Sequence, residues 1–130
     1  MASNGSLVQA TMDQSESRVR ALVAAGADLN EADRKQQTAL LIAAKTDQFE
    51  IAEILIDAGA NVMAASRFGW TVGYAAETSR IAGGPDAEAR LRVLAKLRAE
   101  GFPFPSPHPD QVKAMLAAGT WPPRASPAPH

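Results

Sequence analysis

Residues 33–62 decide the fold, and they read DRKQQTALLIAAKTDQFEIAEILIDAGANV. A polar turn leads to Thr38, after which residues 39–45 form a short apolar run rich in alanine. Three polar residues interrupt this run, and a second apolar run over residues 49–58 ends at Gly59. This order predicts two helices that are joined by a tight turn and ended by glycine. Because helices this short are unstable alone in water, the unit must pack against neighbours.

The rest of the chain supplies such neighbours, because parts of this unit recur at a fixed spacing. The sequence GADLN, which starts at Gly26, returns as GANV at Gly59. Thr38 returns as Thr71 at the same spacing. A period of about 33 residues is typical of short helical repeats that stack side by side.

The repeated unit resembles the ankyrin repeat. Residues 38–44, TALLIAA, stand where that family carries TPLHxAA, and residues 59–62, GANV, match its GADV ending. Two positions depart from the family pattern, because Ala39 replaces its proline and Leu41 replaces its histidine. Loss of that histidine removes a hydrogen bond that ties the turn in the family, so we expect a less regular repeat of the same fold. The resemblance implies an all-α ankyrin-repeat solenoid, in which stacked helix-turn-helix units are joined by short hairpin fingers.

The third repeat departs from the period. Its closing glycine, Gly101, lies about nine residues further from Gly59 than one period predicts. We place the extra residues in a loop near 79–86, where the sequence Gly83-Gly84-Pro85 cannot continue a helix, and expect a longer helix over residues 87–99 to follow. The resemblance then implies a single domain over residues 1–119, with repeats over about 4–32, 33–65 and 66–102 and a divergent C-terminal cap over 103–119.

The C-terminal part is dominated by proline. Alternating prolines over residues 101–109 impose an extended path, and we expect Phe102 and Phe104 to pin it to the preceding helix. Asp110 is expected to cap a short last helix over residues 111–118. Residues 120–130 are predicted to form a mobile, proline-rich tail. Trp121 within it is either a plug against the cap, which we favour, or a free anchor.

Composition narrows the range of functions. The chain has 130 residues, a net charge of −1 and no cysteine, which excludes disulfides and cysteine metal sites. A near-neutral chain has no general attraction to nucleic acid or anionic membranes, and no apolar run is long enough to cross a bilayer. We therefore expect a cytoplasmic protein, or a periplasmic one if a signal peptide has been removed. The alanine content and proline-rich tail suit a bacterial source.

No group of residues suggests catalysis. The two histidines, His108 and His130, lie in proline-rich segments, and no nucleophile stands beside a base. The Gly83-Gly84-Pro85 sequence lacks the spacing and the lysine of a phosphate-binding loop. We predict that the protein is not an enzyme and has no catalytic residue, metal site or cofactor.

The resemblance to ankyrin repeats points instead to recognition of a partner. That family contacts partners through its finger tips and the exposed side of the first helix of each repeat. Tryptophan and arginine are enriched among the residues that contribute most to binding energy in protein interfaces. Exposed aromatic residues on a finger are unfavourable in a protein that binds no partner. Carried over to this chain, the predicted partner-binding residues are Arg34, Lys35, Gln37, Lys45, Arg67, Phe68, Trp70, Thr78 and Ser79.

Structural explanations compete at several of these positions. Trp70 could fold down over the neighbouring helix, and Phe68 could pack on the tail. Arg34, Lys35 and Lys45 could be ordinary solvated charges, as could the basic residues along the helix of residues 87–99. Tyr74 is expected to be structural, with its hydroxyl group bonded to nearby backbone.

The sequence therefore predicts a non-catalytic protein–protein interaction module that is monomeric alone and binds another folded protein, with no nucleic-acid or membrane partner. An adaptor is one form of this role, and an inhibitor or immunity subunit that neutralises a toxin or enzyme is the alternative. Self-association through an incompletely capped end is a third hypothesis. A small-molecule sensor is a fourth, which would need a preformed pocket beneath the inserted loop.

Overall fold

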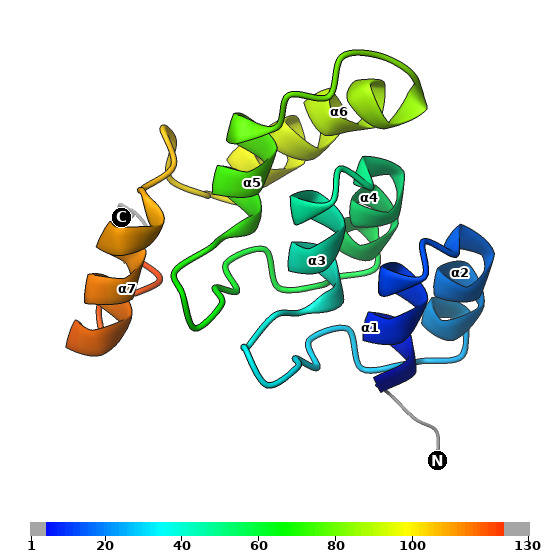
Figure 1. The fold of residues 1–130 in the computed structure, drawn as a ribbon, viewed down its shortest axis with the longest axis horizontal. Coiled ribbons are helices and arrows are strands. Elements are labelled where there is room, and N and C mark those ends of the chain that lie inside the picture. Colours follow the sequence, from blue (N-terminus) through cyan, green and yellow to red (C-terminus); the bar gives the residue numbers. More distant parts are fainter. Residues whose placement is uncertain (1–4, 124–130) are drawn as a thin grey trace.

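Paired helices stacked side by side make up most of the molecule, as Figure 1 shows. The computed structural model describes residues 5–123. Three helix pairs follow one another along the chain, and a single helix comes after them. The pairs are α1 (Gly5–Met12) with α2 (Glu16–Ala24), α3 (Ala39–Lys45) with α4 (Phe49–Asp57), and α5 (Val72–Thr78) with α6 (Pro85–Ala99); the last helix is α7 (Pro109–Ala118).

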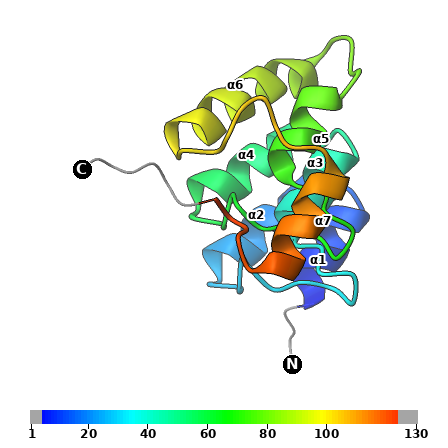
Figure 2. The same ribbon diagram turned by 90° about the vertical axis from the view of Figure 1, so that its left-hand side faces the viewer.

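The helices form two layers, which are seen end-on in Figure 2. The first helices of the pairs, α1, α3 and α5, contact one another in an inner layer, and α2, α4 and α6 contact one another in an outer layer. Two hairpin fingers connect the pairs, and each is closed by one antiparallel bridge, Ala32 with Thr38 and Ala65 with Thr71. This confirms the predicted all-α solenoid of helix-turn-helix units.

Threonine at a repeated position starts two of the inner helices, α3 and α5. Thr38 and Thr71 both have extended backbone, and their hydroxyl oxygens accept hydrogen bonds from the N–H groups of Leu41 and Tyr74. Such a bond satisfies one of the N–H groups that a helix start leaves without a partner in the helix. Gly59 ends α4 with φ at +104°, a conformation that side chains with a Cβ rarely adopt.

The core fills the space between the two layers. Leu40, Leu41, Phe49 and Leu55 are fully buried there. Leu41 stands at the histidine position of the ankyrin pattern. Apolar packing of Leu41 in the core therefore takes the place of the hydrogen bond that this histidine makes in the family. Burial of a leucine side chain contributes about 1.5 to 3 kcal/mol relative to leaving it exposed.

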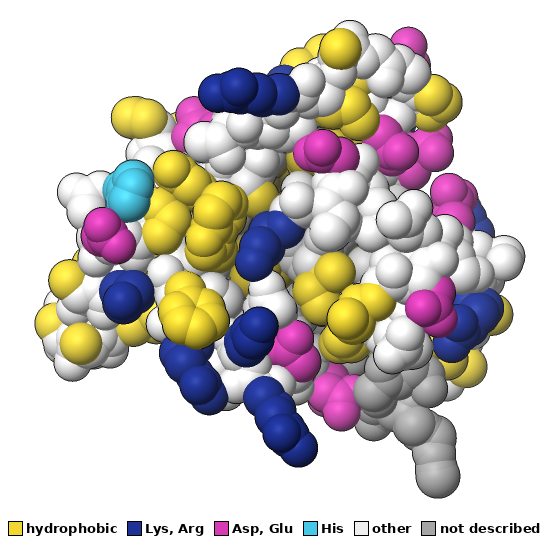
Figure 3. All heavy atoms as spheres, in the orientation of Figure 1, with side chains coloured by type: hydrophobic (Ala, Val, Ile, Leu, Met, Phe, Trp, Pro, Cys, Tyr) yellow, Lys and Arg dark blue, Asp and Glu magenta, His cyan; other side chains and the backbone are white. Residues whose placement is uncertain are grey.

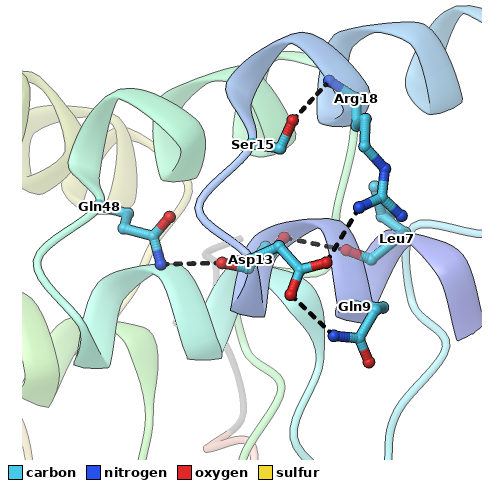
Figure 4. Close-up of polar contacts among 7 residues, drawn as sticks. Leu7, Gln9, Asp13, Ser15, Arg18 and Gln48 are labelled. Atoms are coloured by element: carbon cyan, nitrogen blue, oxygen red, sulfur yellow. Dashed lines mark hydrogen bonds and ion pairs between the residues drawn. The ribbon is translucent and has the colours of Figure 1, made fainter.

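Polar contacts link the first pair to the second (Figure 4). The side-chain amide of Gln48, at the start of α4, donates to the carbonyl oxygen of Thr11 in α1 at 3.0 Å. The carboxylate of Asp13 accepts from Arg18 at 3.0 Å and from Gln9 at 2.9 Å, which holds the turn between α1 and α2. Adjacent repeats are therefore joined by directed bonds as well as by apolar contact.

The third pair supplies a cap to the second. Gln48 precedes α4 but makes no side-chain bond to that helix start. Instead, the Asp86 carboxylate of α6 accepts the N–H of Glu50, in the first turn of α4, at 2.9 Å. A negative group is also favoured there by the helix dipole. The start of α4 thus depends on a residue that comes 36 positions later.

The inserted residues lie only partly in a loop. The connection from α5 to α6 covers residues 79–84, three more than the connection over 46–48, and α6 has 15 residues against 9 in α4. Most of the insertion therefore lengthens the helix. The helix begins at Pro85 and not at residue 87 as predicted, because proline fits the first position of a helix, where its missing N–H is not needed.

Basic residues along α6 are engaged with neighbouring helices instead of being merely solvated. Arg92 and Lys96 contact the Glu53 carboxylate of α4 at 3.0 and 3.7 Å, and Arg90 donates to the Ala76 carbonyl oxygen at the end of α5 at 2.6 Å. Arg98 lies 5.0 Å from the ring centre of Phe104. The sequence analysis missed these contacts, of which those of Arg92 and Lys96 join one repeat to the next.

Both phenylalanines of the extended segment after α6 are tied to that helix, and one of them also reaches α5. Phe104 contacts α6 through Arg98, as expected. The Phe102 N–H donates to the Leu97 carbonyl oxygen of α6 at 3.0 Å, and its buried ring also lies against Gly73 of α5. A β-carbon at Gly73 would lie 2.2 Å from the Phe102 ring, so the absence of a side chain there makes room for the ring.

Helix α7 begins at Pro109 and is capped by His108, not by Asp110 as predicted. The His108 Nδ1 atom accepts the Asp110 N–H at 3.1 Å, and the Gln111 side chain accepts the His108 N–H at 3.0 Å. Trp121 follows this helix, and its ring nitrogen donates to the Met63 carbonyl oxygen at 2.8 Å. Trp121 is therefore packed and not a free anchor, but its hydrogen bond and its aromatic contact are with Met63 and with the Phe102 ring and not with the predicted cap. Residues 124–130 of the predicted mobile tail lie outside the described residues.

Candidate functional site

Side-chain hydrogen bonds hold the two finger tips in shape. In the first finger, the Asp33 carboxylate accepts the backbone N–H groups of Lys35 and Gln37, both at 2.9 Å, and the Gln37 side chain at 3.1 Å. In the second, the Ser66 hydroxyl oxygen accepts the N–H groups of Phe68 and Trp70, both at 3.2 Å. Asp33 and Ser66 occupy the same position of successive repeats and stabilise their fingers in the same way.

The two fingers are also joined to each other. The Arg67 N–H donates to the Lys35 carbonyl oxygen at 2.8 Å, and the Arg67 guanidinium donates to the Arg34 carbonyl oxygen at 2.7 Å. Arg34, Lys35 and Arg67 are all exposed. The backbone positions from which these three side chains extend are therefore held relative to one another.

The two aromatic residues of the second finger are placed differently. Phe68 is 50% exposed at the tip and stands among the large exposed hydrophobic side chains of the described residues. Trp70 is half-buried, and its ring meets the edge of Tyr74 with centres 5.0 Å apart. Trp70 thus folds down on α5, as the structural explanation predicted, and keeps part of its surface accessible.

Tyr74 packs through its ring. Its second aromatic contact is His108, with ring centres 5.7 Å apart. The predicted bond from the Tyr74 hydroxyl group to backbone is absent from the hydrogen bonds of residues 5–123. The structural role predicted for Tyr74 therefore rests on aromatic contact and not on its hydroxyl group.

Lys45, the last residue of α3, lies at the centre of the inner surface, by which we mean the two fingers together with the exposed sides of α1, α3 and α5. Its ammonium donates to the Gln37 side chain at 2.7 Å and lies 5.3 Å from the ring centre of Trp70. Partial burial lowers the pKa of Lys45, and the positive charge of Lys35 lowers it further, while Asp33 acts in the opposite direction. An anion brought to this ammonium would offset both unfavourable effects.

One pocket on the inner surface brings four predicted residues together. It has a volume of about 250 Å³ and lies between α3 and α5. The Ser79 hydroxyl donates to the Asp47 carboxylate at 2.7 Å across its edge. The lining residues are Lys45, Asp47, Trp70, Ala75, Thr78, Ser79 and Arg80, of which Lys45, Trp70, Thr78 and Ser79 were predicted.

A second pocket, of about 290 Å³, lies on the other side of Lys45, between α1 and α3. Lys45 and Gln37 are the predicted residues in it, and Lys45 is common to both pockets. Met12 contributes an apolar side chain that is 56% exposed. The complete lining is Met12, Gln14, Gln37, Ile42, Lys45, Thr46 and Gln48.

The prediction missed Met12, although the sequence carried a signal for it. Met12, Lys45 and Thr78 are each one repeat period apart and end the three inner helices. Gln14 and Asp47 are also one period apart, and both have positive φ, at +59° and +62°. Extending the repeat spacing to the first pair would have placed Met12 and Gln14 in the site.

The site offers a cation, aromatic faces, hydroxyl and amide groups, and exposed apolar side chains. Within residues 5–123, no three histidine, aspartate or glutamate side chains are arranged to hold a metal ion. None of the helices in this part of the chain is long and apolar enough to cross a membrane. These groups suit contact with another macromolecule by shape, charge and hydrogen bonding.

Comparison with known proteins identifies the repeated unit. The family model described as ankyrin repeats, in three copies, matches residues 5–81, which is more than half of the chain. The chain belongs to the ankyrin repeat family. The match ends in the loop before α6, so the lengthened helix α6 and α7 lie outside the part that follows the family pattern. Ankyrin repeats are in general protein–protein interaction modules and typically non-catalytic.

A solved structure shows the same fold. The ankyrin repeat protein EF0377 superposes with a TM-score of 0.63 at 23% sequence identity, over 79% of this chain and 48% of that one. This chain thus spans about half the length of that ankyrin repeat protein. A search of curated proteins finds no match to the sequence. At this identity the likeness establishes the fold and leaves the partner to be argued from the inner surface itself.

Proposed function

We propose that this ankyrin repeat domain is a non-catalytic module that binds another folded protein through its fingers and inner surface. The observation that carries the proposal is the arrangement around Lys45, which separates two open pockets and lies beside Trp70. Phe68, half exposed at the tip of the second finger, extends the same surface. The predicted contacts are Arg34, Lys35, Gln37, Lys45, Arg67, Phe68, Trp70, Thr78 and Ser79.

The rigidity of the fingers supports this proposal. Asp33 and Ser66 fix the backbone of each tip, and Arg67 ties one tip to the other. A surface that is already ordered loses little conformational entropy when it binds. Most of the contact energy of Phe68 and Trp70 is then available for affinity, and each such aromatic residue can contribute about 2 kcal/mol or more.

A pull-down from the lysate of the native host, read by mass spectrometry, tests the proposal. Phe68→Ala is the main variant, because Phe68 is exposed and its truncation leaves the fold intact. Trp70→Phe is the second, since a smaller ring keeps the contact with Tyr74 while changing the accessible edge. Leu91→Ala on α6 is the matched control, because Leu91 is equally apolar and 63% exposed on the outer layer.

A partner retained by the wild type and by Leu91→Ala, but lost with Phe68→Ala, is the expected result. If the wild type and all variants retained the same partners, the fingers would not be part of the binding site. The identity of the partner then separates the two forms of the role. An adaptor leaves the activity of a bound enzyme unchanged, whereas an inhibitor or immunity subunit lowers it in proportion to the amount bound.

A further inference from the structure

We infer that the inner surface selects an acidic partner, namely a protein segment that presents carboxylates beside an apolar side chain. This inference rests on the proposed function and specifies the chemistry of the partner. It follows from how the charges of the chain are distributed, from what holds them in place, and from the apolar groups that lie between them.

The cations of the outer layer are paired within the molecule. Arg92 and Lys96 bind Glu53 of α4, and Lys96 also binds Asp57 at 2.9 Å. On the first pair of helices, Arg20 binds Glu16 at 2.8 Å. Carboxylates of the outer layer therefore neutralise much of its positive charge.

The cations of the inner surface differ from those of the outer layer in their pairing. Within residues 5–123, no carboxylate forms an ion pair with Arg34, Lys35, Lys45 or Arg67. In Figure 3, Lys and Arg side chains gather around a hydrophobic patch over the fingers and α5. A molecule with a net charge of −1 thus carries a local excess of positive charge on this surface.

Asp33 and Asp47, two carboxylates near Lys45, already accept hydrogen bonds within the molecule. Burial raises the pKa of Asp33, but hydrogen bonds from Gln37 and Lys35 outweigh this effect and lower the pKa overall. The Asp33 carboxylate therefore already accepts hydrogen bonds within its own finger. Asp47 accepts the Ser79 hydroxyl group. Among the ion pairs of the described residues, neither carboxylate is joined to Lys45. Both leave its ammonium available to an anion from outside.

Two of these cations are held in place before a partner arrives. Arg67 is held by the Arg34 carbonyl oxygen, and Lys45 by Gln37 and by the ring of Trp70. Lysine side chains that are free in solution lose rotamer entropy when they pair, and this loss reduces the value of most surface ion pairs. Lys45 is already held by its contacts, so it has little rotamer entropy left to lose. An ion pair between Lys45 and a carboxylate should therefore be more stable than one formed by a free lysine.

Apolar groups next to the cations define the second requirement. Phe68 is half exposed beside Arg67, and Met12 is exposed and lines a pocket together with Lys45. A partner that supplied only carboxylates would leave both in water. A basic partner would bring like charges against Lys35 and Lys45, which disfavours it. An acidic segment with an interspersed apolar side chain satisfies both sets of groups.

Two pools of twelve-residue peptides test this inference on the full ¹⁵N-labelled chain. The acidic pool contains Asp, Glu, Phe, Leu, Gly and Ser at mixed positions, and the basic pool has Lys and Arg in place of Asp and Glu. NMR titration at low salt reports which backbone amides respond. We expect the acidic pool to shift the amides of Lys35, Lys45, Arg67 and Phe68, and the response to weaken as salt is raised.

Two charge-reversal variants locate the effect. Lys35→Glu and Arg20→Glu change the net charge equally, but Lys35 lies on the first finger and Arg20 on the outer side of α2. We expect Lys35→Glu to weaken binding of the acidic pool about tenfold, the effect of reversing one nearby charge, and Arg20→Glu to change it by less than about twofold.

Three results would overturn the inference: shifts of equal size with the basic pool, shifts confined to the outer layer, or no response to either pool. Each of these leaves the proposed function testable, because a lysate partner lost with Phe68→Ala would still establish binding through the fingers. A partner retained by Phe68→Ala, together with no response to acidic peptides, would overturn both.

Discussion

The guanidinium of Arg67 donates to the carbonyl oxygen of Arg34, which lies one full repeat earlier in the chain. The two arginines occupy the same finger position in successive repeats, so each finger tip is registered against the next. The backbone bond from Arg67 to Lys35 lies beside it. A side chain that was predicted to contact a partner therefore also holds the fingers together.

Replacing Arg67 should loosen this connection. Arg67→Ala removes the guanidinium bond, and because the site is exposed, we expect a loss of about 1 kcal/mol or less in the free energy of unfolding. Hydrogen exchange at the Arg67 amide, which bonds to Lys35, should become faster. Arg34→Ala is the matched control, since it keeps the carbonyl oxygen that accepts the bond. Unchanged exchange in Arg67→Ala would show that the tie is unimportant.

Asp86 should be required for the start of α4. Asp86→Ala removes the carboxylate that accepts the Glu50 N–H, and loss of a helix cap costs about 0.5 to 2 kcal/mol. Urea denaturation measures this loss, and NMR exchange should show reduced protection of the Glu50 amide. Asp86→Asn retains an acceptor oxygen and should lose less stability. Equal stability of the alanine variant and the wild type would contradict the assignment of Asp86 as a cap.

Gly73 and Phe102 should show strong coupling. Alanine normally stabilises a helix interior relative to glycine by about 0.5 to 1 kcal/mol. At Gly73 we expect the opposite, because the new β-carbon would meet the Phe102 ring at 2.2 Å. In a Phe102→Ala background the ring is absent, so Gly73→Ala should become neutral or stabilising. A double-mutant cycle in urea measures the difference, and additive effects would exclude this contact.

Leu55 should be a main support of the second repeat. It is fully buried in α4, and Leu55→Ala should lower the free energy of unfolding by about 2 to 5 kcal/mol by leaving a cavity. Leu91→Ala on the exposed side of α6 provides the control and should change stability by less than about 0.5 kcal/mol. Chemical denaturation measures the free energy of unfolding of both variants. Similar losses in the two would refute the prediction.

Acid should weaken the first finger through Asp33. The pKa of Asp33 in the folded chain lies below its ordinary value of 3.8. A carboxylate of this kind stabilises the fold fully above its unfolded pKa, and that contribution is lost as the pH falls through the folded value. We therefore expect the wild type to lose more stability than Asp33→Asn between about pH 5 and pH 2. Urea titrations across this range would contradict the assignment if both curves were parallel.

The repeat spacing made most of the fold predictable. Gly26 and Gly59, and Thr38 and Thr71, give the period and the helix starts directly, because each residue acts on its own local backbone. The same register brought Lys45, Trp70, Thr78 and Ser79 to one pocket. Such positions can be read from the sequence because one repeat unit fixes the geometry of the next.

Contacts between distant residues could not be predicted in the same way. The bond from Asp86 to Glu50 and the pairing of Arg92 with Glu53 depend on the rotation of α6 against α4, which no local pattern reveals. The division of the insertion between loop and helix was missed for a related reason. Gly84 and Pro85 mark a break in the chain equally well whether a loop continues or a helix begins.

The separation of paired cations on the outer layer from the cations on the fingers gives this nearly neutral molecule an electric dipole. The field of an approaching acidic protein would exert a torque on this dipole and turn the fingers toward that protein before any contact forms. In the complex that we propose, the charges at the edge of the surface would govern how often encounters succeed, and Phe68 and Trp70 would govern how long the complex lasts. Lys35 would act on the association rate, and the aromatic residues on the dissociation rate.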